Sequence, residues 1–231
     1  MTKTKRITIE GIGDVTLRKR SGMRSIRLSL GQNGTVSASL PSFVPFAAGA
    51  AFVETKRDWI AEHQPPQRLL CNEQRIGKQH VLRFMRSTGS TTRTRLTAEQ
   101  AIVALPSDVT PESPQAQKAA RNVRVKALRR EAQAYLPQRL QALANQHDFT
   151  YRNVSIKHMR SRWGSCNQDK DIALNCLLMD LDYAQMDYVI LHELVHTRIM
   201  AHGSAFWDEL SRYVPHLQAM RKRMRATRAD H

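Results

Sequence analysis

The segment LHELVHTRIMAHGSAFW, residues 191–207, places His192, Glu193, His196 and His202 close together, and the expected fold is built around it. On a helix, residues four positions apart lie on the same face, so His192 and His196 can each offer a ring nitrogen to one metal ion. Glu193 then lies beside the ion and does not bind it. The pattern predicts a helix that carries a catalytic zinc site.

A glutamate beside two metal-binding histidines indicates hydrolytic chemistry. Zinc lowers the pKa of a bound water towards 7, and a neighbouring carboxylate takes the proton as that water attacks. The alternative is a histidine-rich helix that merely packs. Because the surrounding helix is otherwise apolar, two histidines and a glutamate would be costly to bury there without a partner. We therefore expect zinc as cofactor and Glu193 as general base.

The third candidate ligand, His202, follows His192 by ten residues. In an unbroken helix it would point away from the metal, so the chain has to leave the helix near Met200. Metzincin proteases use the same ligand interval, but with glycine at the position where this chain has Ile199. The interval matches that group whereas the turn does not. Three neutral histidines leave the fourth position of zinc to water, as in catalytic sites.

The chain is strongly basic, with 36 Lys+Arg against 20 Asp+Glu and a formal net charge of +16 over 231 residues. Its length allows one large domain or two small ones, and 41% hydrophobic residues are typical of a globular protein. So large a positive charge favours an anionic partner or substrate, such as nucleic acid or a phosphate compound. Charge alone does not choose between them.

The three cysteines, Cys71, Cys166 and Cys176, form no CxxC pair and leave an odd number, which favours reduced thiols in a cytoplasmic protein. The basic N-terminal residues are not followed by an apolar core, so no secretory signal is expected. The longest weakly polar run, residues 43–53, is too short to span a bilayer. We expect a cytoplasmic protein without membrane contact.

Residues 1–107 are expected to form an antiparallel, β-rich lobe. Residues 25–40 alternate apolar and polar positions around an Asn33-Gly34 turn signal, which predicts a hairpin. Further along, HVLRF and RLTAEQAIVAL flank a Ser/Thr-rich loop. They indicate a second hairpin-like unit with a long polar tip.

A proline-rich segment, residues 106–115, is the expected boundary between lobes, and residues 108–231 are expected to form a zincin-like catalytic domain. Helical spacing of Ala and Leu predicts one long helix at 115–146, whose basic face is either solvated or a binding surface. A second helix at about 183–200, capped by Asp182, carries the histidines. The expected fold class is α+β, and no internal repeat is evident.

Four segments between residues 160 and 207 resemble the YgjP-like metallopeptidase family, which is related to SprT-type zinc proteins: RSRWGSC, IALNCLL, DYVILHELVHT and HGSAFW. The stretch from IRLSL to FVETKRDWI is similar to the amino-terminal β lobe of that family. The resemblance implies that His192, His196 and His202 bind zinc and that Glu193 is the catalytic base. It also implies that the RWGSC strand lies beside the cleft.

Four further residues are candidates for the site. Arg160 or Arg162 can stabilise negative charge in the transition state, while the edge of the RWGSC strand holds a substrate backbone. Tyr188 lies one turn before His192 and can donate a hydrogen bond behind the ligands or help polarise a substrate, although core packing explains it equally well. Asp208 can orient the third histidine or merely favour the dipole of its own helix.

Three functions fit the sequence. The first is a zinc-dependent metallopeptidase in which Glu193 activates a zinc-bound water. The second is a nucleoside triphosphate (UTP-type) pyrophosphohydrolase on the same metal site, an activity with which the family has also been linked, although the chain has no Walker loop. The third is a nucleic-acid-associated protein with SprT-like protease activity, whose basic segments at 118–130 and 221–228 contact phosphates. We favour the peptidase, with a peptide as substrate.

Overall fold

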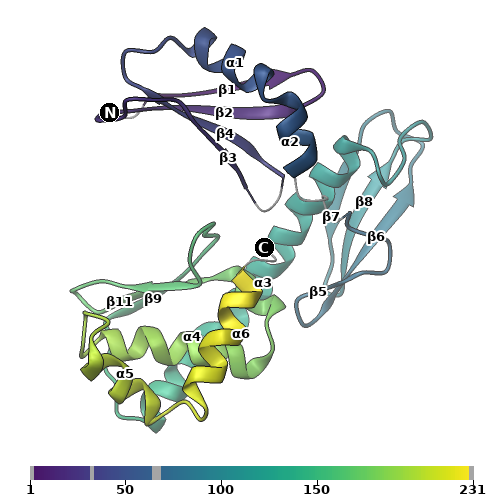
Figure 1. Cartoon of the computed structure of the whole chain (residues 1–231). Helices are drawn as coiled ribbons and strands as arrows, with labels where there is room; N and C mark the ends of the chain where they lie inside the picture. Colours follow the sequence, from purple (N-terminus) through teal and green to yellow (C-terminus); the bar gives the residue numbers. More distant parts are fainter. Residues whose placement is uncertain (1–2, 32–33, 64–68, 229–231) are drawn as a thin grey trace. The chain divides into compact units, whose positions relative to one another are not determined.

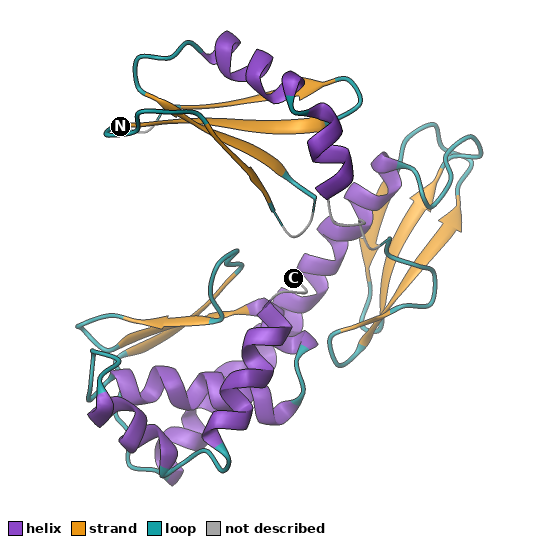
Figure 2. Ribbon diagram, in the orientation of Figure 1, coloured by secondary structure: helices purple, strands orange, loops and turns teal. Residues whose placement is uncertain are grey.

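The computed structural model describes residues 3–31, 34–63 and 69–228. The chain divides into two compact units, a first unit of Met1–Arg68 with Ala226–His231 and a second unit of Leu69–Arg225 (Figure 1). Both units combine helices with small sheets (Figure 2), so the architecture is mixed α/β. Among the described residues, no helix is long and apolar enough to cross a membrane.

The first unit is a four-stranded sheet covered on one face by helices. Its strand order is β1-β2-β4-β3. Val15, Leu17 and Leu40 of the sheet share a buried cluster with Val53 and Ile60 of the helices, so the opposite face of the sheet is left exposed. The elements are β1 (Thr4–Ile9), β2 (Gly13–Arg20), β3 (Arg27–Leu30), β4 (Val36–Pro41), α1 (Phe46–Thr55) and α2 (Arg57–His63).

The second unit is built around one long helix, α3 (Pro114–Gln146). A four-stranded sheet precedes this helix, and a three-stranded sheet with the remaining helices follows it (Figure 1). The strands are β5 (Arg75–Ile76), β6 (His80–Arg86), β7 (Arg93–Leu96), β8 (Gln100–Leu105), β9 (Asn153–Lys157), β10 (Gly164–Cys166) and β11 (Asp171–Asn175). The later helices are the 3-10 helix η1 (Cys176–Asp180), α4 (Tyr183–His196), α5 (Ser204–Ser211) and α6 (Leu217–Arg228).

The long helix α3 begins one residue before its expected start. The Ser113 side chain accepts a hydrogen bond from the Ala116 backbone N–H, and Pro114 occupies the first turn, where its missing N–H costs nothing. Buried leucines then recur at helical spacing along one face, among them Leu128 and Leu136. The 3.6-residue period is what made this helix predictable from the sequence.

The two compact units divide at a different place from the expected boundary at residues 107 and 108. The sheet of β5 to β8 buries Leu82 and Val103 in the same cluster as Leu128 of α3, so the sheet and the helix belong to one unit. Without α3 that face of the sheet would be exposed to water. The proline-rich segment 106–115 is only the loop that leads into the helix, and the division falls between Arg68 and Leu69.

The expectation of an antiparallel lobe is wrong in part. Residues 25–40 do contain the antiparallel pair β3–β4, although Asn33 of the expected turn lies outside the described residues. However, β2 pairs with β4 in parallel, and so does β6 with β8. The Ser/Thr-rich loop connects β6 to β7, which are not neighbours in the sheet because β8 lies between them. The second hairpin is therefore β7–β8, and its turn is closed by a hydrogen bond between Thr97 and Gln100.

The two four-stranded sheets repeat the same topology. The order β5-β6-β8-β7 matches β1-β2-β4-β3, with antiparallel outer pairs and a parallel central pair, and a helix follows each sheet. In each sheet, the strand that comes last in the sequence ends in Leu-Pro-Ser. These residues are Leu40-Pro41-Ser42 at the end of β4 and Leu105-Pro106-Ser107 at the end of β8. An internal repeat that was not evident in the sequence is thus present in the fold.

One buried carboxylate fastens α3 to the turn between β5 and β6. Glu131 is 3% exposed and accepts hydrogen bonds from the backbone N–H groups of Lys78, Gln79 and His80, and its Oε1 lies 2.6 Å from His80 Nδ1. A Cβ atom at Gly77 would lie 2.3 Å from this carboxylate, so only glycine fits beside it. Glu131 therefore fixes the place where the second sheet meets the helix.

Replacing this carboxylate should destabilise the second unit. Glu131→Ala leaves several buried donors without an acceptor, and we expect a loss of about 3 kcal/mol or more in the free energy of unfolding. Urea denaturation followed by circular dichroism measures this loss. Glu112→Ala, at an exposed glutamate ahead of α3, is the control and should change little. Equal stability of the two variants would show that Glu131 does not fasten the helix to the sheet.

Candidate metal centre

The structure brings three imidazole rings together at one point. His192 and His196 come from α4, and His202 comes from the loop before α5. The Nε2 atom of His202 lies 3.0 Å from that of His192 and 3.1 Å from that of His196. Two nitrogens bound to one tetrahedral zinc ion lie about 3.3 Å apart. The three histidines are thus close enough together to bind a single ion.

The end of α4 explains how His202 returns to its partners. The helix stops at His196, earlier than the expected residue 200, and the chain turns so that the His196 Nδ1 atom lies 3.1 Å from the Ile199 carbonyl oxygen. A proton on Nδ1 donated to this carbonyl leaves Nε2 free to bind a metal. Trp207 Nε1 donates to the His202 carbonyl at 3.1 Å and fixes the loop from the other side.

The apolar ring of Phe206 packs against all three imidazole rings. It is fully buried, and its ring centroid lies 4.9 Å from that of His192, 4.5 Å from that of His196 and 4.7 Å from that of His202. Sequence reasoning missed this residue. The signal was present, because Phe206 lies four positions after His202, and the first turn of α5 brings it under the cluster.

The electrostatics of the three rings suit a cation. Burial, with smaller effects of His196, His202 and Arg221, lowers the pKa of His192 to about 3, and burial also lowers the pKa of His196. Metal ligation requires neutral imidazoles, so this direction favours it. The buried Nδ1 atom of His192 has no hydrogen-bond partner among the described residues. The lowered pKa values fit a bound cation better than a packed cluster without one.

Glu193 is buried between α4 and the strand β10. It is 5% exposed, and burial raises its pKa to about 8, against the opposing effect of Arg162. A Cβ atom at Gly164 would lie 2.5 Å from Glu193 Oε1, so glycine is required where the strand crosses the carboxylate. Sequence reasoning treated this strand as the wall of the cleft and did not single out Gly164.

The strand β10 is at the edge of its sheet. Its sheet has the order β10-β11-β9, and among the described residues no strand pairs with the other side of β10. In Figure 1 α4 lies along this sheet, and its contacts with β10 and β11 confirm that the two are packed together. An unpaired strand edge therefore lies next to the buried Glu193.

Asn175 organises the loop ahead of β10. It is 2% exposed, and its Nδ2 atom donates to the carbonyl oxygens of Met159 at 2.7 Å and Arg162 at 2.9 Å. Its backbone N–H donates to the Trp163 carbonyl oxygen. This buried amide, which follows the apolar run IAL at the end of β11, is a positioning residue that sequence reasoning missed.

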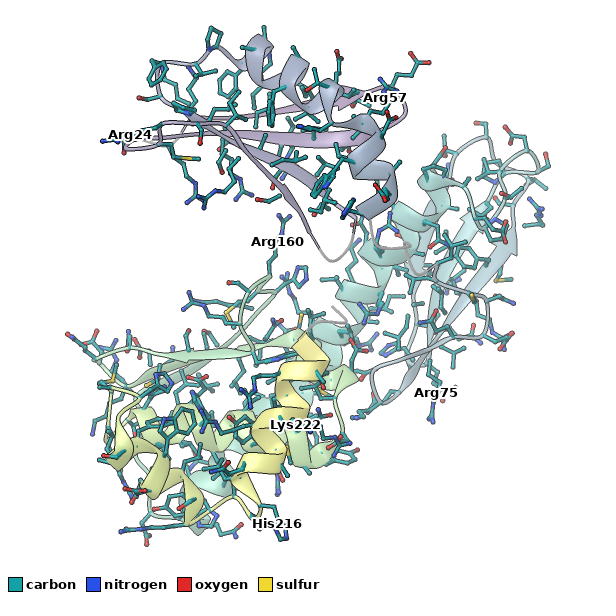
Figure 3. All side chains as sticks on the ribbon, in the orientation of Figure 1. Arg24, Arg57, Arg75, Arg160, His216 and Lys222 are labelled. Atoms are coloured by element: carbon teal, nitrogen blue, oxygen red, sulfur yellow. The ribbon has the colours of Figure 1, made fainter. Side chains whose placement is uncertain are left out.

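The four further candidates lie at different distances from the cluster. Arg162 acts on the charge of Glu193, whereas Arg160 is exposed on the loop, with its side chain pointing outward (Figure 3). Tyr188 is 9% exposed, and its ring centroid lies 6.0 Å from that of His192. Asp208 is exposed, and in the described part of the chain no hydrogen bond joins it to the third histidine, so the proposed orienting role finds no support.

Arg221 is a second cation that sequence reasoning did not assign to the centre. Its guanidinium carbon lies 3.6 Å from the ring centroid of Trp207, and its charge lowers the pKa values of His192 and Tyr188. The sequence treated its segment, RKRMR, as a contact for external phosphates. Part of that charge instead faces the histidine cluster.

Cys166, at the end of β10, is poorly suited to act as a nucleophile. Burial, reinforced by the charge of Glu193, raises the pKa of the Cys166 thiol to about 11. The thiolate that attacks in cysteine enzymes would therefore be scarce at neutral pH.

Comparisons with known proteins point to one family. The model of the YgjP-like family, described as a metallopeptidase domain, matches residues 24–227. None of the curated proteins matches the chain. Among solved structures, the metallopeptidase zymogen jannalysin of Methanocaldococcus jannaschii is similar with 24% sequence identity, over 45% of this chain and 95% of that chain, at a TM-score of 0.32.

The three histidines should bind one zinc ion per chain. Because the ion binds the folded protein, zinc at about a thousandfold its dissociation constant adds about 4 kcal/mol to the free energy of unfolding. Zinc content after dialysis, and the melting temperature with and without a chelator, test this. His196→Ala should lose both the zinc and the shift, whereas His216→Asn, at an exposed histidine with φ 52°, should keep both. Undiminished zinc binding by His196→Ala would contradict the assignment.

Proposed function

The chain belongs to the YgjP-like metallopeptidase-domain family, and from this premise we propose that it is a zinc-dependent metallopeptidase. We further propose that His192, His196 and His202 hold the ion and that Glu193 is the general base. The observation that carries the proposal is the position of a buried carboxylate directly beside three converging imidazoles. When bound, zinc supplies a Lewis acid and lowers the pKa of a bound water.

The work assigned to Glu193 is proton transfer. Its carboxylate lies on α4 next to His192, is shielded from bulk water, and is held in place by the backbone of Gly164. It takes the proton of the attacking water and gives it to the leaving amine. A dry, fixed carboxylate needs little reorganisation to do so, which favours a catalytic rather than a structural role.

The edge of β10 gives the substrate a place to bind. An extended peptide can pair with the free backbone groups of Gly164 to Cys166 as an added strand, and this pairing brings its backbone past Glu193. Backbone pairing is independent of the substrate side chains, so the selectivity has to come from neighbouring residues. This geometry favours a peptide over a compact nucleotide.

Two arginines can stabilise the negative charge that develops on the substrate carbonyl. Arg162 lies close enough to lower the pKa of Glu193, and Arg221 lies close enough to lower that of His192. Arg160 remains a weaker candidate because it is exposed on its loop. We expect Tyr188 to support His192 by packing, with its hydroxyl available for a hydrogen bond.

The nucleoside triphosphate alternative is tested in the same experiment. Zinc-loaded protein is incubated with a panel of unfolded protein substrates and, separately, with the four ribonucleoside triphosphates. We expect peptide cleavage, and Glu193→Gln should lower kcat by about 10²- to 10⁴-fold while zinc content stays unchanged. Glu112→Gln is the matched control. Triphosphate hydrolysis that depends on Glu193, without peptide cleavage, would overturn the peptidase proposal.

The contact between Gly164 and Glu193 makes a second prediction. In Gly164→Ala the new methyl group has to displace the carboxylate or the strand, and a displacement of about 1 Å costs roughly a hundredfold in kcat. Zinc content should remain at one ion per chain. The control is Gly89→Ala, at a glycine where an added Cβ would make only an ordinary contact with Ser87. Full activity of Gly164→Ala would show that the position of Glu193 is not critical.

A further inference from the structure

The exposed face of the first sheet carries only polar and basic side chains at its centre. The strand register places exposed residues of neighbouring strands opposite one another. They form two rows across the sheet, each with one residue from β1, β2, β4 and β3 in that order. The buried face holds Val15, Leu17, Val36, Ala38 and Leu40 instead. The two exposed rows are Thr4, Arg18, Ser39 and Arg27, and Arg6, Thr16, Ser37 and Ser29.

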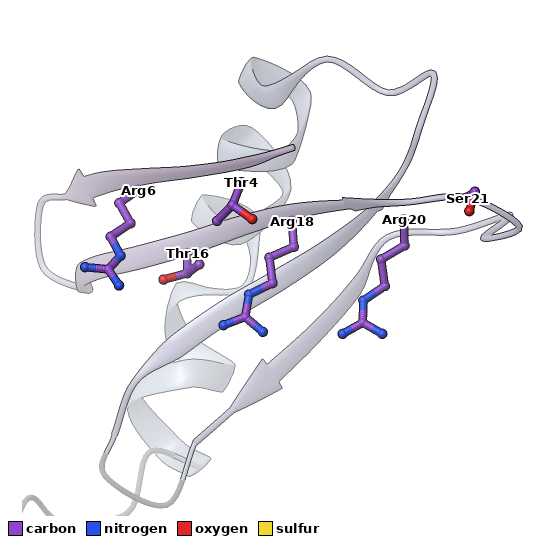
Figure 4. A pocket seen from close by; sticks show the side chains of 6 residues that line it. All are labelled: Thr4, Arg6, Thr16, Arg18, Arg20 and Ser21. Atoms are coloured by element: carbon purple, nitrogen blue, oxygen red, sulfur yellow. The ribbon is translucent and has the colours of Figure 1, made fainter. Parts of the chain in front are cut away.

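Part of this face is hollowed. Six residues of β1, β2 and the turn after β2 line a hollow of about 660 Å³. Figure 4 shows the guanidinium groups of Arg6, Arg18 and Arg20 pointing to the same side of the sheet, with the Thr16 hydroxyl between them. We call this surface, which consists of the two rows and Arg20, the arginine face.

The arginines of this face have no acidic partner. Among the described residues, no ion pair joins Arg6, Arg18, Arg20 or Arg27 to a carboxylate. The carboxylate nearest in register, Asp14, lies at the end of the sheet and accepts a hydrogen bond from Thr8. Four arginines of one face therefore have no ion pair within the described part of the chain.

Other basic segments are partly neutralised within the protein. On α3, Arg124 pairs with Asp180 and Arg139 makes a double hydrogen bond to Asp187. On α6, Arg223 pairs with Asp182. In the basic segments at 118–130 and 221–228, which the sequence suggested as phosphate contacts, some arginines are thus already paired with carboxylates of the protein. The arginines of the arginine face have no such pairs among the described residues.

The equivalent face of the repeated sheet is also basic, but its arginines alternate with apolar side chains. Arg83 pairs with Glu73, while Arg75, Arg93 and Arg95 have no ion pair among the described residues. Val81, Ile102 and Ala104 lie next to them in the strand register. The arginine face differs because only hydroxyl side chains lie between its arginines in the register.

We propose that the arginine face binds the phosphate backbone of a nucleic acid. Guanidinium groups and hydroxyls are the donors that proteins use for phosphate oxygens, and this face supplies both. Arg18 and Arg20 are two residues apart on one strand, which spaces them by roughly 6.6 Å. The face has no aromatic side chain on which bases could stack, so it holds the backbone without regard to sequence. It also lacks the apolar anchor of a membrane-binding surface.

The test compares two variants of equal net charge in the full-length, zinc-loaded protein. One carries Arg6→Gln, Arg18→Gln and Arg20→Gln, and the control carries Arg75→Gln, Arg93→Gln and Arg95→Gln on exposed strands of the second sheet. Fluorescence anisotropy with single-stranded oligonucleotides of two sequences is measured from 50 to 300 mM salt. We expect the first variant to flatten the slope of log K against log salt by about 2, and the control to keep the wild-type slope.

The outcomes separate this proposal from the alternatives and from the peptidase. Equal losses in both variants would show that binding is a diffuse effect of net charge. Equal affinity for polyglutamate, or for vesicles of anionic lipid, would show that the face does not select a nucleic acid, and an absence of binding at 50 mM salt would also overturn the proposal. The arginine variant should retain its melting temperature, zinc content and peptide cleavage. Failure of the peptidase assay therefore leaves this result standing.

Discussion

Burial of one face of α3 is the interaction on which the second unit depends. The helix has 33 residues and is about 50 Å long. This length lets the sheet of β5 to β8 pack against one part of the helix and the histidine-bearing helix α4 against another. Leu128 packs in the core that also takes the sheet, and Arg139 binds Asp187 of α4 through two hydrogen bonds of 2.8 and 2.7 Å. The histidine-bearing helix is therefore positioned by contacts with α3 that lie away from the three imidazole rings.

What could be predicted from the sequence was local and periodic. The helical spacing of α3, the cap at Asp182 and the histidine pair of α4 all follow from contacts within a few residues. Pairing of β6 with β8 was missed because a two-residue period shows which face is buried, but not which neighbour a strand takes. Gly164 was missed for a related reason, since it matters through its contact with Glu193, which is distant in the sequence.

The distribution of charge shows why net charge alone was a weak guide. The formal +16 includes arginines paired on α3, an arginine beside the histidines, and unpaired arginines on both four-stranded sheets. The unpaired arginines are the ones available to an external anion. A function assigned from the total charge would have placed the anion at α3, where Arg124 already binds Asp180.

The metal centre combines groups that oppose folding when no cation is present. Glu193 and His196 are 5% and 8% exposed, and an ionised carboxylate buried so far from water is costly unless a positive charge compensates it. The three Nε2 atoms must all be unprotonated to bind a metal, and in that state their lone pairs face one another across 3.0 and 3.1 Å. A bound cation removes both costs at once. For an ion held by these histidines, metal affinity and the local stability of α4 are therefore linked.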